Sequence, residues 1–264
     1  MARPLSGASE VAARFDRVSE VYDETREPLT EGAVDRLAVV LSRDGLSSLL
    51  EVGVGTGRIA LPLQRRGFDL VGADLSRGML QKARTKGLRN LFLADANHLP
   101  FREKTFDAVV LAHIIHLLDD PQATFDRLTG IARKEIVAIL RKRDGGASPF
   151  AEDRGQIRES FRKAAEELGY PLNRSAGDWR QRFRQEEEFV SASRPRELLT
   201  IDDTEVVTTV GERLSFFEKR AYGYPSEMPD ELFRKIMSIV KASVDLGREV
   251  RYHRVEQVAL WRVE

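Results

Sequence analysis

The chain has 264 residues, of which 42% are hydrophobic and 32% are charged, and its 42 lysines and arginines are balanced by 42 acidic residues. That length suits one large domain, or a domain with an elaboration, and the apolar content suffices for a sizeable core. The missing basic excess argues against a nucleic-acid partner, and the missing cysteine excludes disulfides, thiolate zinc sites and cysteine nucleophiles. Because no apolar run has the length of a signal-peptide core or a membrane span, we expect a cytoplasmic protein with no membrane partner.

The N-terminal part of the chain, residues 1–45, is predicted to be helical. Two amphipathic runs fill residues 7–43, namely VAARFDRVSEVYDE and TEGAVDRLAVVLSR. Phe15, Val18 and Tyr22 are separated by three and four residues, so one interpretation places them on one helix face packed against the sheet.

Apolar runs alternate with helical segments between residues 46 and 149. Strands are predicted over 48–54, 68–75, 88–96, 106–114 and 135–143, and helices over 58–67, 76–87 and 120–134. These strands are apolar without a clean period of two, which is typical of strands that are covered on both faces. The pattern predicts a doubly wound α/β fold around a mostly parallel sheet.

Beyond residue 149 the pattern is mainly helical and polar. Helices are predicted over 151–171, 175–183, 203–217 and 229–247, a strand is suggested over 186–195, and a closing strand is predicted over 248–263. We therefore expect a seven-stranded sheet that closes with residues 248–264, and an α-helical cap inserted over residues 150–247.

A glycine-rich loop follows the first predicted strand and opens a helix. It contains Glu51, then glycine at positions 53, 55 and 57, and then Arg58. Backbone N–H groups and the positive helix end face a ligand in this context, and glycine permits positive φ and close approach of the ligand. A dinucleotide fingerprint needs a further glycine at position 58, so the arginine argues against a nicotinamide cofactor.

The acid followed by Gly53, Gly55 and Gly57 resembles motif I of the class I S-adenosylmethionine (SAM)-dependent methyltransferases. GADLSRGML, LADANHLPF and FDAVVLAHIIHLLDD resemble the motifs that follow in this family, and the likeness is greatest to its type 11 group over roughly residues 10–143. The resemblance implies a Rossmann-like methyltransferase fold and methyl transfer (EC 2.1.1.-). It also implies SAM as the donor and S-adenosylhomocysteine (SAH) as the product. No pair of histidines stands with a carboxylate in the pattern of a metal site, so no metal is expected, and we expect a monomer or homodimer.

The resemblance also assigns residues to the nucleoside half of SAM. Asp74 ends the second predicted strand and would accept both ribose hydroxyls, as acids do in dinucleotide sites. Asp95 and the Ala96 backbone would bind the adenine amine, and Leu75 and Met79 would pack against the adenine face. Taken singly, each of these acids is also explained as a helix cap or a surface charge.

The methionine half of SAM would lie along the three glycines. Glu51 would anchor its ammonium, and Ala112 and His113 at the end of the fourth strand would complete this part of the site. Family members often carry a Tyr-Asp pair before the core, which makes Tyr22 a candidate lid residue and places Arg26 within reach of the SAM carboxylate. The helices of residues 1–45 would then form a lid over the cofactor site.

His116 matches a histidine that family members often carry in the loop after the fourth strand. A histidine there is a candidate base that takes a proton from an oxygen or nitrogen nucleophile. The alternative interpretation is that His116 packs under the cofactor or hydrogen-bonds a backbone carbonyl. Because methyl transfer depends mainly on positioning and desolvation, a clear base is not required.

The acceptor is predicted to be a small molecule. Methylation of exocyclic base amines typically uses an Asn/Asp-Pro-Pro-aromatic run where this chain has LAHI, and pyrimidine C5 methylation needs a cysteine. Aromatic side chains of the predicted cap would enclose a partly apolar acceptor, or would instead fill the core of the cap; they are Trp179, Phe183, Phe216, Phe217, Tyr222 and Tyr224. Methylation of RNA or protein, and SAM binding without transfer, stay open as alternatives.

Overall fold

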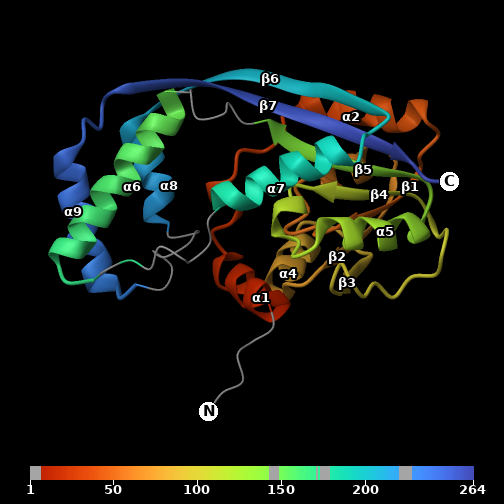
Figure 1. The fold of residues 1–264 in the computed structure, drawn as a ribbon, viewed down its shortest axis with the longest axis horizontal. Coiled ribbons are helices and arrows are strands. Elements are labelled where there is room, and N and C mark those ends of the chain that lie inside the picture. The colour runs from red at the N-terminus through yellow and green to blue at the C-terminus, as the bar shows by residue number, and fades with distance from the viewer. Residues whose placement is uncertain (1–6, 143–148, 171, 173–178, 220–227) are drawn as a thin grey trace, which may run out of the picture.

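The computed structural model describes residues 7–142, 149–170, 172, 179–219 and 228–264, and within these ranges seven strands form one sheet (Figure 1). The strands are β1 (Ser48–Val52), β2 (Asp69–Asp74), β3 (Leu91–Leu93), β4 (Phe106–Ala112), β5 (Ala132–Lys142), β6 (Glu197–Thr209) and β7 (Glu249–Arg262). Their order is β3-β2-β1-β4-β5-β7-β6, with β1 to β5 parallel and β7 antiparallel to both β5 and β6. The predicted doubly wound, mostly parallel sheet of seven strands is confirmed.

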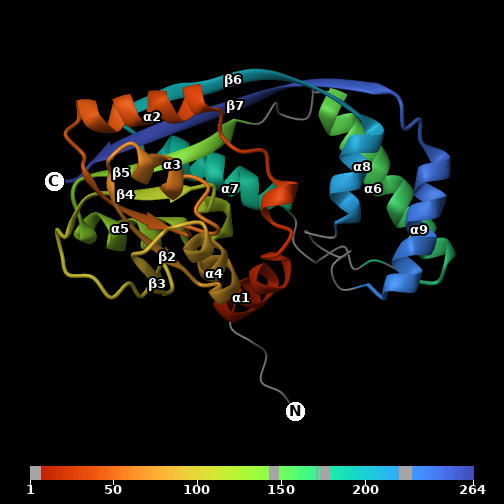
Figure 2. The same ribbon diagram turned by 180° about the vertical axis from the view of Figure 1, so that it is seen from behind.

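Helices cover both faces of the sheet (Figures 1 and 2). The described helices are α1 (Gly7–Val18), η1 (Asp23–Thr25), α2 (Glu31–Arg43), α3 (Ala60–Arg65), α4 (Arg77–Thr85), η2 (Ile115–Leu117), α5 (Pro121–Ile131), α6 (Pro149–Glu167), α7 (Trp179–Ala192), α8 (Val210–Glu218) and α9 (Asp230–Ser243). Leu49 of β1 packs in the core under α2, α3 and α4, whereas the next residue, Leu50, packs in the core under α5 and α7. Successive side chains of a strand point to opposite faces, so burial on both faces explains why the strands show no period of two.

A third hydrophobic core lies at one end of the molecule, where β6 and β7 continue past β5 as a two-stranded ribbon (Figure 1). The pairing of β5 with β7 runs from Glu135↔Arg262 to Lys142↔Val255, whereas β6 follows β7 as far as Thr209↔Glu249. Helices α6, α8 and α9 pack on this far part of the ribbon, and Phe161 is buried completely among them. The ribbon therefore connects the helical part of the chain to the sheet.

Two of the predicted elements are wrong. Residues 186–195 were expected to include a strand, but the structure has helix α7 up to Ala192. The helix expected over 203–217 begins only at Val210, because residues 203–209 belong to β6, and Thr209 and Glu212 form a capping box that starts α8. The range predicted as a helical cap, 150–247, thus contains a strand of the sheet.

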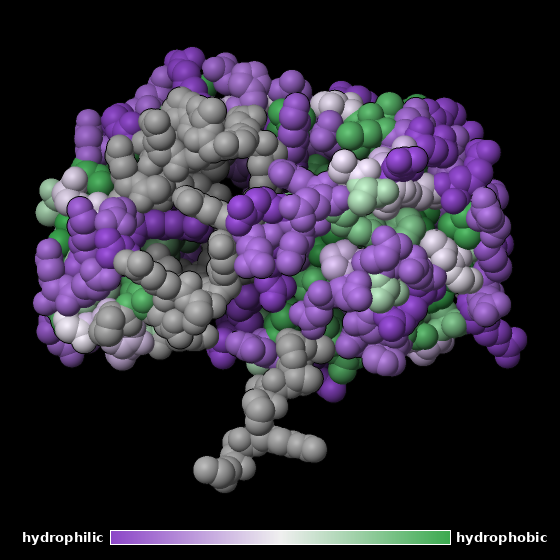
Figure 3. Space-filling model, viewed as in Figure 1, coloured by the Kyte–Doolittle hydropathy of each residue, from purple (hydrophilic) through white to green (hydrophobic). Residues whose placement is uncertain are grey.

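Hydrophilic side chains cover most of the face seen in Figure 3, and hydrophobic ones appear there in smaller patches. In the described ranges, no helix combines the length and the apolar character that crossing a membrane requires.

Candidate functional site

The carboxyl ends of three adjacent parallel strands bring the predicted cofactor residues to one edge of the sheet. Glu51 lies at the end of β1 and is paired in register with Gly72 of β2 and Val110 of β4. Asp74 ends β2 and Ala112 ends β4. Ligands of open α/β sheets bind at this edge, in the crevice outside the strand ends.

The three glycines after β1 all have positive φ, at +71°, +55° and +81° for Gly53, Gly55 and Gly57. A Cβ on Gly53 would stand 2.5 Å from Ile114 Cγ2, and one on Gly57 would stand 2.5 Å from Leu88 Cδ1, so both positions also exclude a side chain by packing. A Cβ on Gly55 would meet only the Gly53 carbonyl, at 4.0 Å, among the described atoms. Gly55 therefore presents an open backbone.

Asp74 joins this loop to the start of α4. Its Oδ2 accepts a hydrogen bond from the Gly55 N–H at 2.8 Å, and its Oδ1 accepts one from the Ser76 N–H, also at 2.8 Å. Burial raises the pKa of the Asp74 carboxyl, although both backbone bonds act in the opposite direction. Each carboxylate oxygen has a second lone pair, so the group can accept further donors such as hydroxyls.

Glu51 is a buried acid that lacks a full set of partners. Glu51 is 2% exposed, and its Oε2 has no hydrogen-bond partner among the residues described. Burial, and then the charge of Asp74, raise the pKa of Glu51 to about 8, against the opposing charge of Arg58. An unsatisfied buried oxygen is costly, so this position suits a cationic hydrogen-bond donor such as the ammonium of SAM.

The N-terminal segment is attached to this edge at two points. Asp16 of α1 accepts hydrogen bonds from the Ser76 hydroxyl at 2.6 Å and from the Gly78 N–H at 2.8 Å. Asp23 of η1 accepts a hydrogen bond from the Thr56 hydroxyl in the glycine loop and forms an ion pair with Lys86. Helix α1 and the following turn therefore lie against the glycine loop and α4.

Tyr22 lies on that turn and not on α1, because the helix ends at Val18. The interpretation of Phe15, Val18 and Tyr22 as one helix face is therefore wrong, although the Phe15 and Tyr22 rings still meet at 6.1 Å. The Arg26 guanidinium stacks over the Tyr22 ring at 4.7 Å, and burial lowers the pKa of Arg26. The two predicted lid residues thus lie together.

The residues predicted to hold adenine lie around the ends of β2 and β3. Asp95 follows β3, and its Oδ1 accepts a hydrogen bond from the Asn97 N–H at 2.8 Å. Leu75 and Ala96 are half-buried. Met79 is 1% exposed, so the described side chains already cover it, and its N–H donates to the Ser76 hydroxyl.

His113 directly follows β4 and has a strained backbone conformation, with φ +56°. The ring Nε2 of His113 lies 3.6 Å from Glu256 Oε2, and the backbone N–H of His113 donates to the Ile139 carbonyl at 3.0 Å. Burial, followed by the charges of Arg141 and Arg58, holds the pKa of His113 well below its usual value. The imidazole is therefore neutral at neutral pH.

His116 lies in η2, underneath helix α7. Its ring centroid is 4.6 Å from that of Phe183, and its Nδ1 is 3.6 Å from Glu186 Oε1, with both His116 and Glu186 largely buried. Arg182 donates to the carbonyls of His116 and Leu117 at 3.4 Å each. Sequence reasoning missed Glu186, because the segment that carries it was predicted as a strand.

The aromatic side chains predicted for the cap have different surroundings. Phe183 contacts His116, whereas Phe217 packs on Phe161 in the third core, with ring centroids 5.0 Å apart. Phe216 lies 5.9 Å from the Arg213 guanidinium. The Trp179 side chain, Tyr222 and Tyr224 lie outside the described residues.

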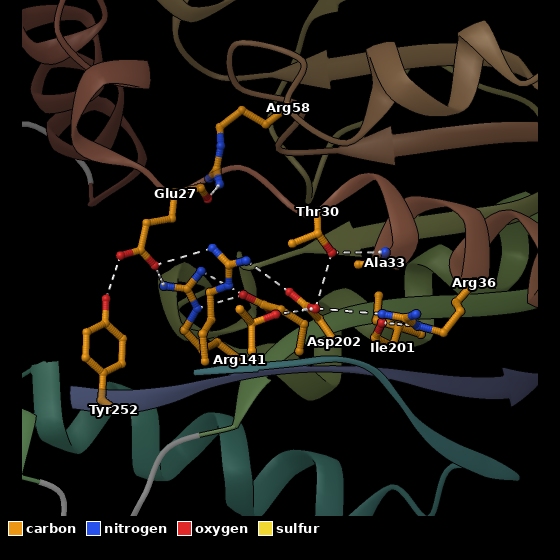
Figure 4. A network of polar contacts seen from close by, with 12 residues as sticks. Glu27, Thr30, Ala33, Arg36, Arg58, Arg141, Ile201, Asp202 and Tyr252 are labelled. Carbon is orange, nitrogen blue, oxygen red and sulfur yellow. Dashed lines mark hydrogen bonds and ion pairs between the residues drawn. The ribbon is translucent and has the colours of Figure 1, made fainter. Parts of the chain in front are cut away.

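Sequence reasoning also missed a network of charges around Glu27 (Figure 4). The Tyr252 hydroxyl donates to Glu27 Oε1 at 2.5 Å, and three guanidiniums lie at 3.6 to 4.0 Å from its carboxylate, those of Arg141, Arg213 and Arg254. A signal was present in the sequence. Tyr252, Arg254 and Glu256 occupy alternate positions of the closing strand, so all three point to one face.

In the part of the chain that the structure describes, no three His, Cys, Asp or Glu side chains are grouped so as to hold a metal ion.

Comparison with known proteins gives a family. The family model described as a methyltransferase domain matches residues 50–140. An uncharacterized methyltransferase of Geobacillus sp. is 31% identical over 160 residues, which cover 60% of this chain and 71% of that protein. A demethylmenaquinone methyltransferase of Renibacterium salmoninarum is 34% identical over 137 residues, which cover 49% of this chain and only 58% of that relative's length.

Among solved structures, the YcgJ protein of Bacillus subtilis superposes with a TM-score of 0.52 at 12% identity, over 87% of this chain and 98% of that one. At that identity the likeness concerns the fold alone. The family match, the relatives and this fold agree with the glycine loop and the strand-end acids, and the chain therefore belongs to the class I SAM-dependent methyltransferases.

Proposed function

We propose that this protein transfers a methyl group from SAM to a small-molecule acceptor. The observation that carries the proposal is the buried, incompletely bonded Glu51 carboxyl, which lies beside Asp74 and the open backbone of Gly55 at the carboxyl edge of the sheet. When bound, SAM supplies a methyl group that is activated by a sulfonium cation. The acceleration that the protein adds then comes mainly from positioning the acceptor in line and from excluding water.

The nucleoside of SAM would lie beside the ends of β2 and β3. Asp74 has free lone pairs for the ribose hydroxyls, and Asp95 and the Ala96 backbone would bind the adenine amine. Leu75 would line the adenine face, and Met79, which is already covered by other side chains, would support that face from beneath.

The methionine tail would lie along the glycine loop. Glu51 would bind the ammonium, and Ala112 and His113 would close the far side of the tail. Tyr22 and Arg26 would cover it, since both lie on the turn that is anchored to the loop through Asp23. In this proposal residues 1–45 contribute the lid, although α2 itself packs in the core under the sheet.

His116 is proposed as the base that takes a proton from the acceptor, with Glu186 positioned to orient its ring from α7. The competing role is structural, because Phe183 and α7 cover the same ring. In a transfer assay, His116→Gln should lower the transfer rate with unchanged SAH affinity; an unchanged rate would assign His116 to packing.

The acceptor is proposed to be a small molecule. Relatives of this chain are named as methyltransferases of demethylmenaquinone and of phosphatidylethanolamine, and both names denote small molecules. For the proposed division into a core over 46–149, a substrate-binding elaboration over 150–247 and a closing strand over 248–264, the separate core of α6, α8 and α9 supports the elaboration, although β6 within its range belongs to the sheet. We propose a cytoplasmic monomer or homodimer that needs no metal.

Thermal unfolding with cofactor tests the proposal. SAH should raise the melting temperature of the wild type, Asp74→Ala should abolish that shift, and Asp69→Ala, at the exposed opposite end of β2, should retain it. Absence of a shift in the wild type would refute SAM binding.

A transfer assay tests the acceptor. Labelled SAM would be incubated with the protein and with pools of small molecules, RNA and protein. Label in a small molecule supports the proposal, label in RNA or protein contradicts it, and no transfer favours SAM binding alone.

A further inference from the structure

Arginines are in excess where the N-terminal segment meets the ends of β5 and β7 (Figure 4). Besides the three guanidiniums near its carboxylate, Glu27 contacts a fourth, because Arg58 donates to its main-chain carbonyl. Arg141 and Arg254 each have a second carboxylate partner, Glu256 at 2.7 Å and Asp202 at 3.0 Å respectively. Among the described residues, no carboxylate lies within 4 Å of the Arg58 guanidinium.

This excess positive charge lies beside the proposed site of methyl transfer. Arg58 is the first residue after the glycine loop, and Arg141 lies near the end of β5, the strand next to β4, which His113 directly follows. Glu256 lies between His113 and Arg141, because its Oε2 is 3.6 Å from His113 Nε2 and its Oε1 pairs with Arg141 at 2.7 Å. In agreement with these contacts, burial and then the charges of Arg141, Arg58 and Arg26 lower the pKa of His113.

Binding of SAM would not remove the excess of positive charge. The SAM tail carries one carboxylate, but its ammonium and the sulfonium add two positive charges, so SAM leaves the site at least as positive as before. Arg58 and Arg141 lie in partly buried positions, where like charges repel more strongly than in water. An anionic group on the acceptor would relieve this repulsion, and planar guanidiniums bind carboxylates and phosphates through paired hydrogen bonds.

We propose that the acceptor carries a carboxylate or phosphate group, and that Arg58 and Arg141 bind this group beside His113. The inference rests on the proposed methyl transfer and deepens it, since it names the chemical class of the acceptor. The main competitor is the carboxylate of SAM itself as the ligand of the same two arginines.

The test uses the full chain saturated with SAH and titrated with inorganic phosphate or with acetate, against potassium chloride at matched ionic strength. Phosphate or acetate should raise the melting temperature beyond the chloride control, and whichever anion does so identifies the group. Arg58→Gln should abolish the anion shift and retain the SAH shift. Arg66→Gln is the matched control, because Arg66 pairs with Glu31 and Asp35 on the surface and should keep both shifts.

Arg141→Gln alone leaves Glu256 buried without its partner and risks unfolding, so the double variant Arg141→Gln/Glu256→Gln is used. It should lose the anion shift as well. If neither anion stabilises the SAH complex, or if both variants keep the shift, the inference is wrong. It is also wrong if Arg58→Gln weakens the binding of SAH but not the binding of methylthioadenosine, which lacks the amino-acid tail. If SAH does not raise the melting temperature of the wild type, the proposed function is refuted instead.

Discussion

The backbone N–H of Gly55 donates to Asp74 Oδ2 at 2.8 Å, which ties the middle of the glycine loop to the acid at the end of the neighbouring strand. The loop conformation is thus fixed by a residue that is itself proposed to bind the ribose. This hydrogen bond holds the glycine loop and the strand-end acid together before any cofactor binds. A substitution at either residue is therefore expected to disturb the other.

Gly55→Ala should weaken SAH binding by about tenfold or more, because a methyl group would stand on the open side of the loop. The positive φ should also cost about 1 kcal/mol of folding free energy. Gly67→Ala is the matched control: Gly67 has φ +91° and open space around it, but it lies at the other end of α3. Calorimetric titration with SAH checks both variants. Equal affinities of the two would contradict the placement of the cofactor on this loop.

Glu51→Gln should change the pH dependence of stability. The pKa of Glu51 is raised to about 8 in the folded protein, so between its ordinary value and about 8 the unfolded chain releases a proton that the folded chain retains. Folding is therefore penalised increasingly as pH rises through this window, by on the order of 1 kcal/mol per pH unit, and the glutamine variant escapes the penalty. Urea unfolding near pH 5 and near pH 7 measures this difference. The free energy of unfolding of the variant, relative to that of the wild type, should be larger at the higher pH.

The same substitution should alter proton release on binding. A cationic ammonium next to Glu51 favours the ionised carboxylate, so SAH should expel a proton from the wild type near pH 7 and none from this position in Glu51→Gln. Calorimetry in two buffers of different ionisation enthalpy measures the proton. Identical release from both proteins would show that Glu51 is not the ammonium ligand.

The sequence predicts the sheet up to β5 well, because the evidence for it is local. Apart from β3, whose Phe92 and Leu93 are exposed, each strand there is a largely buried apolar run, and the glycine spacing and the acid at Asp74 lie within a few residues of a strand end. The strand β6 was missed for a physical reason. Its half-buried TEVVTT segment runs directly into a helix that has its own cap at Thr209. The strand conformation of this segment depends on pairing with residues of β7 that lie 40 to 50 positions away, from Thr204↔Arg254 to Thr209↔Glu249.

The missed parts of the candidate site are also products of long-range contact. Glu186 meets His116 across 70 positions of sequence, and Glu27 meets Tyr252 across 225. The alternation of Tyr252, Arg254 and Glu256 predicts that they share one face of the closing strand, but no pattern in the sequence indicates which distant residue meets that face. Motif matching locates the proposed SAM site, because the residues of that site follow one another along the first strands, whereas the residues proposed to face the acceptor come from segments that only the tertiary structure brings together.

Gly78→Ala tests whether α1 packs as closely on α4 as the contacts indicate. An added Cβ would lie 2.7 Å from the Ser19 hydroxyl, just after α1, and 3.2 Å from Asp16 Oδ1 in α1, so these side chains must shift and the free energy of unfolding should fall by about 1 to 3 kcal/mol. Gly130→Ala, in α5, meets nothing within 4 Å and should gain up to about 1 kcal/mol from helix propensity. Urea unfolding distinguishes them, and a gain of similar size in both variants would refute the close packing of α1.

Tyr252→Phe tests the link between the N-terminal segment and the ribbon that carries α6, α8 and α9. The Tyr252 hydroxyl donates to Glu27 at 2.5 Å and accepts from Arg213 at 3.2 Å, so its removal leaves the half-buried Glu27 carboxylate with one donor fewer. The free energy of unfolding should fall by about 2 kcal/mol, the range measured for hydrogen bonds to charged groups. Tyr170→Phe is the control, because the Tyr170 hydroxyl has no hydrogen bond among the described residues; it should change stability by less than about 0.5 kcal/mol. If the two variants unfold at the same urea concentration, the Glu27–Tyr252 bond does not hold the N-terminal segment to the ribbon.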